Sequence, residues 1–286
     1  MQKFTTTVSA LGLLLLLGAC GGSDDPAPVS AAEADATEAA EPAAAATPRY
    51  DDGTVRFDRM PGELGYWANP SQHSLIEKGV TVQMDDKGML ANIDDASKVA
   101  PFMDWSLALY RYRQANGLKD DPVNVCISPA GPRHLQDPMG FRILQDRNLD
   151  RVYVLFGGGN RNWRHINMDG RAAPNLDEVQ STFFGYSNGS WDGDTLVVES
   201  SGFNDRFWFS NGGLPHTPAL KLTERFTRQD HDTLVYSVTI DDPRTYTRPW
   251  VAEWTLDWVP GDIDESFCEK GRPLAAPVQQ PAASVQ

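Results

Sequence analysis

The chain has 286 residues, of which 41% are hydrophobic and 22% charged, a composition typical of a soluble globular protein with one or two domains. Its formal net charge is −14 at pH 7, so it has no excess of cations with which to neutralise phosphates, and we exclude nucleic acid as a partner. Eight Trp, eight Tyr and twelve Phe predict a well-filled core or the walls of an apolar or sugar-binding cleft.

Residues 1–19 have the features of an export signal. A lysine near the start is followed by an apolar run over residues 11–17, too short for a permanent membrane span, and then by small residues. The tetrapeptide Leu17–Cys20 resembles a bacterial lipobox, in which the cysteine receives a diacylglycerol and becomes the mature N-terminus. Gly21 in place of Asp resembles the outer-membrane sorting pattern. We therefore expect an outer-membrane lipoprotein that faces the periplasm, with an ordinary secreted protein as the alternative.

Residues 20–49 consist largely of Ala, Pro, Glu, Asp and Ser, with almost no large apolar side chain. Such a segment cannot bury enough surface to offset its ordering entropy, so we expect a disordered tether. Its reach as a flexible chain is about 30 Å. A single β-rich domain over residues 50–272, with a helical N-terminal part, and a disordered tail over residues 273–286 complete the expected organisation.

One helix is predicted at about residues 101–116. Pro101 suits a first helical position, and Gly117 is a suitable stop. Apolar side chains recur at helical spacing within it, at Phe102, Trp105, Leu109 and Tyr112. This stripe is expected to dock on a sheet, and the alternative is that it binds a partner.

Beyond Asp120 the pattern changes to short segments rich in β-branched and aromatic residues, which predict strands. They are Phe141–Gln145, Arg151–Phe156, Trp163–Met168, Ser181–Tyr186, Thr195–Ser200, Lys221–Phe226, Thr233–Ile240 and Trp250–Trp258. Four dipeptides suited to tight hairpins separate some of them, namely Asp169-Gly170, Asn188-Gly189, Asp192-Gly193 and Asn211-Gly212. We therefore expect a mainly β fold, an antiparallel meander that closes into a barrel or doubles into a twisted sandwich.

Two cysteines, Cys126 and Cys268, remain once Cys20 is assigned to lipid. In an oxidising compartment two thiols most often pair, so we expect a disulfide, with a reactive thiol as the alternative. None of the five histidines lies three or four residues from another, so no helical metal pair exists and we expect neither metal nor cofactor. They are His73, His134, His165, His216 and His231.

Several segments together resemble a family of exported bacterial proteins with no assigned activity. The most specific are WRHINMDGR at residues 163–171, GYSNGSWDGDTLVVESSGF at 185–203 with Asn204-Asp205 after it, and LPHT at 214–217. TERF at 223–226, TIDDP at 239–243 and YTRPW at 246–250 follow in the same order. The likeness covers roughly residues 99–270, and it implies a shared fold and export but no reaction. Gly189 and Trp191, just before a hairpin, also resemble lipocalin-like barrels.

His165 is the first candidate for chemistry. On a strand it shares a face with Asn167, whereas Arg164 points to the opposite face. It is either a general base or a residue on the wet face of the sheet. Arg171 follows an expected turn at Asp169 and either binds an anion or pairs with a carboxylate.

His216 is the second candidate, because it lies in a loop made stiff by Pro215 and Pro218. Asn204 and Asp205 begin the segment that leads into this loop, and aromatic residues including Trp208 follow them. A histidine, a carboxylate and aromatic walls form an acid–base pocket, or else a packed loop crossing.

Charged residues also occur on the predicted strands. Glu224 and Arg225 are neighbours and must point to opposite faces, so whichever faces the interior needs a buried partner. Asp241-Asp242-Pro243 offers paired carboxylates, although Asp-Pro is more typical of a turn.

The leading expectation is a membrane-tethered lipoprotein whose strands enclose a hollow for a small apolar or aromatic molecule, reached by the loop of His216. Its expected ligand contacts are Arg164, Arg171, Trp191, Asn204 and Trp208. One alternative is a hydrolase, lyase or isomerase with His216 and Asp205 as acid and base and His165 as a further catalytic candidate. A second alternative is an envelope assembly protein without a small ligand. The sequence does not identify a protein partner.

Overall fold

The structure, a computed structural model, describes residues 45–68, 75–159, 162–264 and 266–268, all within a compact unit of residues 43–286. The predictions of a signal peptide, a lipid on Cys20 and a C-terminal tail over residues 273–286 lie outside the described residues, as does His73. Among the helices that are described, none has the length and apolar character to cross a bilayer.

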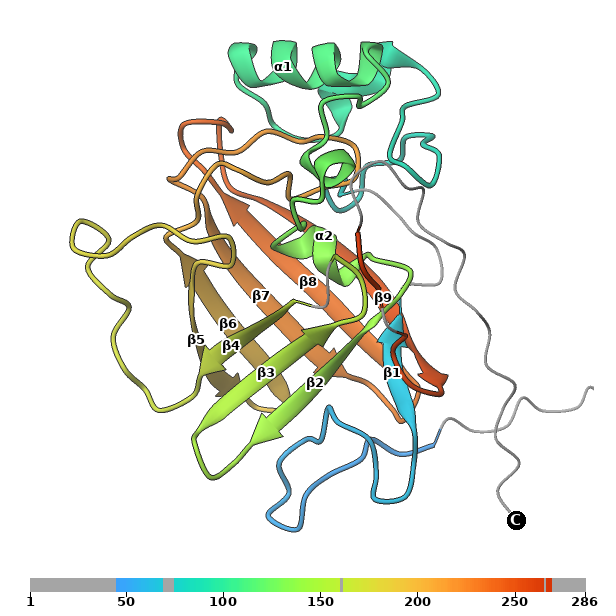
Figure 1. Ribbon diagram of the computed structural model, residues 1–286, viewed down its shortest axis with the longest axis vertical. Helices are drawn as coiled ribbons and strands as arrows, with labels where there is room; N and C mark the ends of the chain where they lie inside the picture. The colour runs from blue at the N-terminus through green and yellow to red at the C-terminus, as the bar shows by residue number, and fades with distance from the viewer. Residues whose placement is uncertain (1–44, 69–74, 160–161, 265, 269–286) are drawn as a thin grey trace, which may run out of the picture. The chain divides into compact units, whose positions relative to one another are not determined.

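The described strands form one closed barrel, in which each strand pairs with the next along the chain and the last pairs with the first (Figure 1). They are β1 Gly65–Ala68, β2 Phe141–Asp146, β3 Arg151–Phe156, β4 Trp163–Asn167, β5 Tyr186–Asp192, β6 Thr195–Ser201, β7 Lys221–Arg228, β8 Thr233–Asp241 and β9 Trp250–Pro260. All neighbouring pairs except β4–β5 are antiparallel. The predicted meander is therefore confirmed, and it closes as a barrel.

The strand predicted at residues 181–186 is wrong. That segment has irregular backbone apart from a bridge between Thr182 and Phe203, and β5 begins where the predicted strand ends. β5 runs through Asn188-Gly189, which had been expected to turn. The reason is packing: a Cβ on Gly189 would lie 2.4 Å from Sδ of Met168, so glycine permits a close approach within the sheet.

β4 and β5 form the exceptional junction of the barrel, which we call the seam. They run parallel, are joined by a crossover over residues 168–185, and pair at Asn167 and Asn188 alone. By contrast, β8 and β9 pair continuously along their length. The junction of β1 and β2 also has a single pair, but both of its side chains, Trp67 and Phe141, are fully buried in the core.

The predicted helix exists, but with another start and another buried face. α1 spans Asp104–Ala115 and buries Ser106, Tyr110 and Gln114, whereas the side chains of Trp105 and Tyr112 are 45% and 50% exposed. α1 lies above one end of the barrel in Figure 1, with loops between the helix and the strands. Nε2 of Gln114 donates to two loop carbonyls, and Oγ of Ser106 donates to another. Polar side chains therefore face inward here.

Three short helical segments accompany α1, namely η1 Ile93–Lys98, η2 Pro122–Val125 and α2 Pro132–Leu135. The residue that follows η2, Cys126, forms a disulfide with Cys268, with Cα atoms 5.4 Å apart, so the predicted pairing is confirmed. The bridge ties the segment before β2 to the chain beyond β9.

Large side chains fill the interior of the barrel. Trp67, Phe141, Phe226, Tyr236 and Leu256 all point inward and are at most 1% exposed. A ligand site along the barrel axis, as expected from the sequence, would have to displace them. The seam is therefore the part of the wall to consider.

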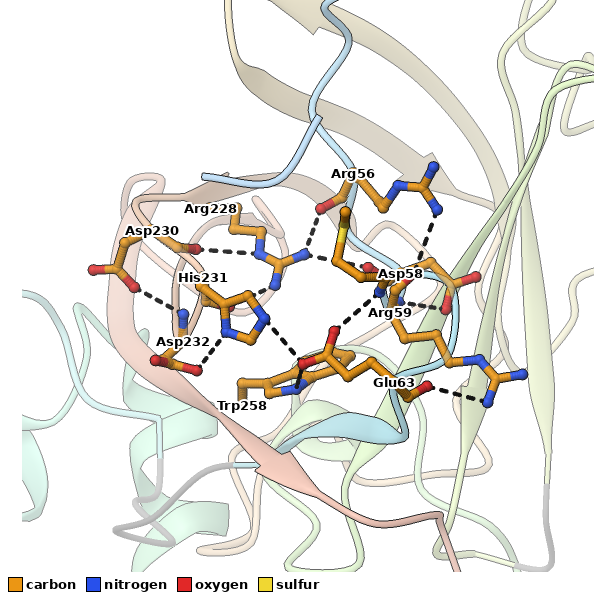
Figure 2. A network of polar contacts seen from close by, with 10 residues as sticks. Arg56, Asp58, Arg59, Glu63, Arg228, Asp230, His231, Asp232 and Trp258 are labelled. Carbon is orange, nitrogen blue, oxygen red and sulfur yellow. Dashed lines mark hydrogen bonds and ion pairs between the residues drawn. The ribbon is translucent and has the colours of Figure 1, made fainter. Parts of the chain in front are cut away.

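The end of the barrel opposite α1 is closed by a polar network around Arg228, which Figure 2 shows. Its guanidinium donates to the backbone carbonyls of Arg56, Asp58, Asp230 and His231. The same group lies 4.9 Å from the ring centroid of Trp67 and 5.3 Å from that of Trp258.

A histidine completes this closure. Nε2 of His231 is 2.9 Å from Oε1 of Glu63, which also accepts from the indole of Trp258 (Figure 2). Residues before the expected domain boundary at residue 50 already contact the barrel: the Thr47 hydroxyl bonds to the Gln229 carbonyl and Arg49 pairs with Asp194. Both ends of the barrel are thus covered, one by this network and the other by α1 and the loops beneath it.

Candidate functional site

A pocket of about 290 Å³ lies at the seam, where β4 and the end of the crossover diverge. It is lined by Trp163, Arg164, His165, Asn167, Thr182, Phe184, Gly185, Tyr186 and Ser187. Inward-facing Arg164 and outward-facing His165 both contribute, so the pocket passes along the edge of β4. Its volume is at the lower end of the range for ligand pockets, roughly 300–1,000 Å³.

An ion pair lies behind this pocket. Arg164 bonds Glu224 of β7 through two parallel contacts of 2.8 and 2.9 Å, and the Tyr236 hydroxyl donates to Oε1 of Glu224 at 2.8 Å. Burial opposes the charge on Arg164, but the neighbouring Glu224 outweighs it and raises the pKa of the guanidinium. Arg164 therefore stays charged, and the interior partner that the sequence required for Glu224 is found.

Two polar atoms at the seam have no hydrogen-bond partner among the described residues. They are Nε of Arg164 and Oδ1 of Asn167, and both are closed off from solvent. The Asn167 amide is otherwise held, since its Nδ2 lies 3.3 Å from the carbonyl of Ser187 and from Oδ1 of Asn188. A buried donor without a partner costs about 1–3 kcal/mol, so a ligand that supplied the missing partner would gain that amount.

Aromatic side chains form the inner wall of the pocket. Phe184 stacks in line with Phe156 and His134, and the His134 and Phe156 rings are 3.8 Å apart and nearly parallel. Burial lowers the pKa of His134 to about 3, and the charge of Arg164 acts in the same direction. His134 is therefore neutral at physiological pH and acts here as a flat aromatic surface.

The electrostatic character of the pocket differs from that of the whole chain. None of its lining residues is acidic, although the chain carries 39 Asp and Glu against 25 Lys and Arg. The pKa of His165 is lowered, first by burial and then by the charges of Arg151 and Arg171. Two cations therefore act on the mouth of the pocket, although one of them, Arg171, is itself paired with Asp169.

The acid–base pair expected from His216 and Asp205 does not form. Asp205 is exposed and makes no hydrogen bond or ion pair with any described residue, and the ring nitrogens of His216 face the carbonyl oxygens of Phe207 and Thr217 at 2.9 and 3.3 Å. The carboxylate that acts on His216 is Asp242, which accepts bonds from the backbone and hydroxyl of Thr217.

This loop is accordingly packed, which was the alternative interpretation of its sequence. The Phe207 ring lies 4.5 Å from the His216 ring, and burial lowers the pKa of His216. Asp242 belongs to the predicted turn, and its oxygens also accept from Arg244 and Thr245, so it is a structural carboxylate.

The remaining expected ligand contacts are dispersed. Arg171 pairs with Asp169 within the crossover, Trp191 stacks on Phe57, and Trp208 lies under the guanidinium of Arg113. Asn204 comes nearest to the pocket, because its backbone N–H donates to the carbonyl of Thr182 at 2.8 Å. Of the predicted residues, Arg164 and His165 line the seam pocket.

A larger groove is less suited to an apolar molecule. It has a volume of about 710 Å³ and crosses the outer face of β5 to β8, but its lining has no aromatic side chain and includes Glu199 and Asp241. The residues that the structure describes contain no group of three or more His, Cys, Asp or Glu placed to hold a metal ion.

Comparison with known proteins adds no name to this site: no protein-family model, curated protein or solved structure matches the chain. The resemblance to exported bacterial proteins stays a prediction.

Sequence reasoning missed Phe184 and Tyr186, because they belonged to a segment predicted as an ordinary strand, and it missed Ser187, which directly follows that segment. A usable signal was the run Phe183-Phe184-Gly185-Tyr186, in which a glycine interrupts three aromatic residues. Gly185 has a φ of +64°, a conformation that glycine adopts without strain.

Proposed function

We propose that the protein binds a small, partly aromatic molecule in the seam pocket. The observation that supports this most is a pocket with aromatic walls at the place where a single residue pair holds the barrel wall, with two unpartnered polar atoms beside it. Binding sites commonly combine apolar walls with a few polar groups that orient the ligand.

The size of the pocket limits the ligand. A cavity of about 150 Å³ accepts a single benzene ring, so about 290 Å³ is suited to roughly two fused rings with a small substituent. Long acyl chains are poor candidates on this ground. The leading expectation from the sequence is thus kept, but its site moves from the barrel axis to the seam.

Titration with two-ring aromatic probes, 2-naphthol and 2-naphthamide, tests this proposal. We expect saturable quenching of tryptophan fluorescence, because the Trp163 side chain lines the pocket and is 54% exposed. Trp163→Ala should weaken binding several-fold, measured by calorimetry. Trp105→Ala, at an exposed tryptophan on α1, is the matched control and should leave binding unchanged. Equal loss in both variants, or no saturable binding in the parent protein, contradicts the proposal.

We further propose that this barrel is held at the periplasmic face of an outer membrane by lipid on Cys20. The support is the sequence Leu17–Cys20 behind an export signal and the polar segment that follows. In cells fed with labelled palmitate, the parent chain should become labelled and sediment with membranes, and Cys20→Ser should do neither. Labelling that persists in Cys20→Ser contradicts the assignment.

A further inference from the structure

The charges around the seam pocket narrow the ligand class, an inference that rests on the proposed function. We infer that the ligand is a compact aromatic anion, with its rings between Trp163 and Phe184 and its acidic group directed toward Arg164.

The side chains that line the seam pocket favour an aromatic ligand. Two aromatic side chains, Trp163 and Phe184, come from opposite sides of the seam, and Tyr186 adds a third. The hydroxyl of Tyr186 is already used, because it donates to the carbonyl of Gln180 at 2.9 Å. The aromatic groups therefore offer ring surface, and orientation has to come from Arg164, His165 and Asn167.

The charged groups beside the pocket favour an anion. Arg164 is matched by Glu224, but Glu224 already accepts from two nitrogens of Arg164 and from the Tyr236 hydroxyl. Nε of Arg164 is the donor left over, and a donor on a cation favours a negatively charged acceptor. Arg151 and Arg171 lie close enough to act on His165, although Asp169 already pairs with Arg171, and no carboxylate lines the pocket.

The weak junction between β4 and β5 gives an acidic group access to Arg164. Nε of Arg164 and Oδ1 of Asn167 are closed off from solvent, so an acidic group reaches Nε only if β4 and β5 separate slightly. One residue pair, Asn167 with Asn188, holds them together, and the Asn167 amide makes two long contacts of 3.3 Å across the seam. Widening at this junction disturbs few ladder bonds, and unlike the other single-pair junction, β1–β2, it does not disturb Trp67 and Phe141 in the core.

Two isosteric probes separate charge from shape: 2-naphthoate carries a carboxylate, and 2-naphthamide has the same rings with a neutral amide. A hydrogen bond to a charged group contributes about 1.5–3 kcal/mol, so 2-naphthoate should bind at least about tenfold more tightly. Calorimetric titration of the full-length protein measures both affinities. If neither probe binds, the proposed function fails, whereas equal binding overturns the anion inference alone.

Variants locate the preference. The double variant Arg164→Gln, Glu224→Gln removes both charges and keeps amide groups at both positions, and it should bind the two probes about equally. His165→Glu places a negative charge on the exposed face of β4 and should weaken 2-naphthoate about fivefold while sparing 2-naphthamide. Thr255→Glu, an exposed site on β9, is the control of equal charge and should change neither affinity.

The variant His165→Glu keeps the inference testable if the double variant misfolds. His165 is exposed, so its replacement tests the inference even if the double variant does not fold. A tenfold preference for 2-naphthoate that survives both sets of changes shows that Arg164 and its surroundings do not select the charge.

Discussion

At the scale of single residues, the pair of Arg164 and Glu224 places two charges in the interior. Removing two charges from water costs several kcal/mol per ion, and an apolar pair of equal volume is often as stable. Here the cost is offset by two short contacts to Arg164 and one from Tyr236. The pair lies behind the seam pocket, so we expect its Arg164 to meet the ligand proposed above.

The first prediction concerns Glu224. Replacing it with alanine leaves Arg164 buried without its partner and should lower the free energy of unfolding by about 3–5 kcal/mol, measured in urea. The matched control is the next residue in the chain: Arg225→Ala breaks an exposed ion pair with Asp192 and should cost about 1 kcal/mol or less. Similar losses in the two variants would show that the interior pair is not the dominant interaction.

The second prediction concerns His134 and acid. Its pKa is lowered from 6.5 to about 3 in the folded protein, so the unfolded chain takes up the proton first as the pH falls. The contribution of neutral His134 to the free energy of unfolding is therefore fully present above pH 6.5. It is lost as the pH falls from 6.5 to about 3, at about 1.4 kcal/mol for each pH unit.

In the variant His134→Phe, the new ring should keep the stack with Phe156 but has no nitrogen that can take up a proton. The stability of the variant should fall less steeply than that of the parent between pH 6.5 and 4 in urea titrations at several pH values. Parallel curves over that range would contradict the assignment of a neutral, buried His134.

At the scale of elements, the seam is where we expect the barrel to open. β4 and β5 are the parallel exception in an antiparallel meander, and their connection is the long crossover over residues 168–185. In hydrogen exchange of the free protein, we expect the amides of β4 and of residues 182–188 to exchange at least tenfold faster than those of β8 and β9. Uniform protection around the barrel would argue against a seam that widens.

The disulfide is the other element-scale constraint. Cys126 and Cys268 are 142 residues apart, and a loop of that length stabilises the folded state by about 5 kcal/mol in chain-entropy terms. The double variant Cys126→Ala, Cys268→Ala should unfold at correspondingly lower urea concentration. The parent protein in reductant should show the same shift, and an unshifted midpoint in both would contradict this account.

The strands that could be predicted are those whose pattern is local. Arg151–Phe156 was predicted to the residue, because alternating apolar side chains mark a half-buried strand. β1 has only four residues and gives too short a pattern. Asn188-Gly189 is locally a turn signal, but it pairs with Glu199 and Val198 of β6, and Ile166 and Met168 pack close to Gly189.

At the scale of the whole molecule, closure of the barrel explains why the site was only partly predictable. Arg164 and His165 could be chosen because their own strand alternates, but their neighbours across the seam come from a non-local junction. The loop of His216 failed as a site for the same reason. Its proline-rich sequence indicated stiffness, but the contacts that fix it come from Asp242, at the end of the next hairpin.

The central claim is that a ligand binds at the seam, and the most direct measurement is a crystal structure of the protein soaked with 2-naphthoate. The account predicts ring density between Trp163 and Phe184, with the carboxylate within hydrogen-bond distance of Nε of Arg164. Density along the barrel axis or beside His216, or a seam that stays empty at saturating probe, would contradict it.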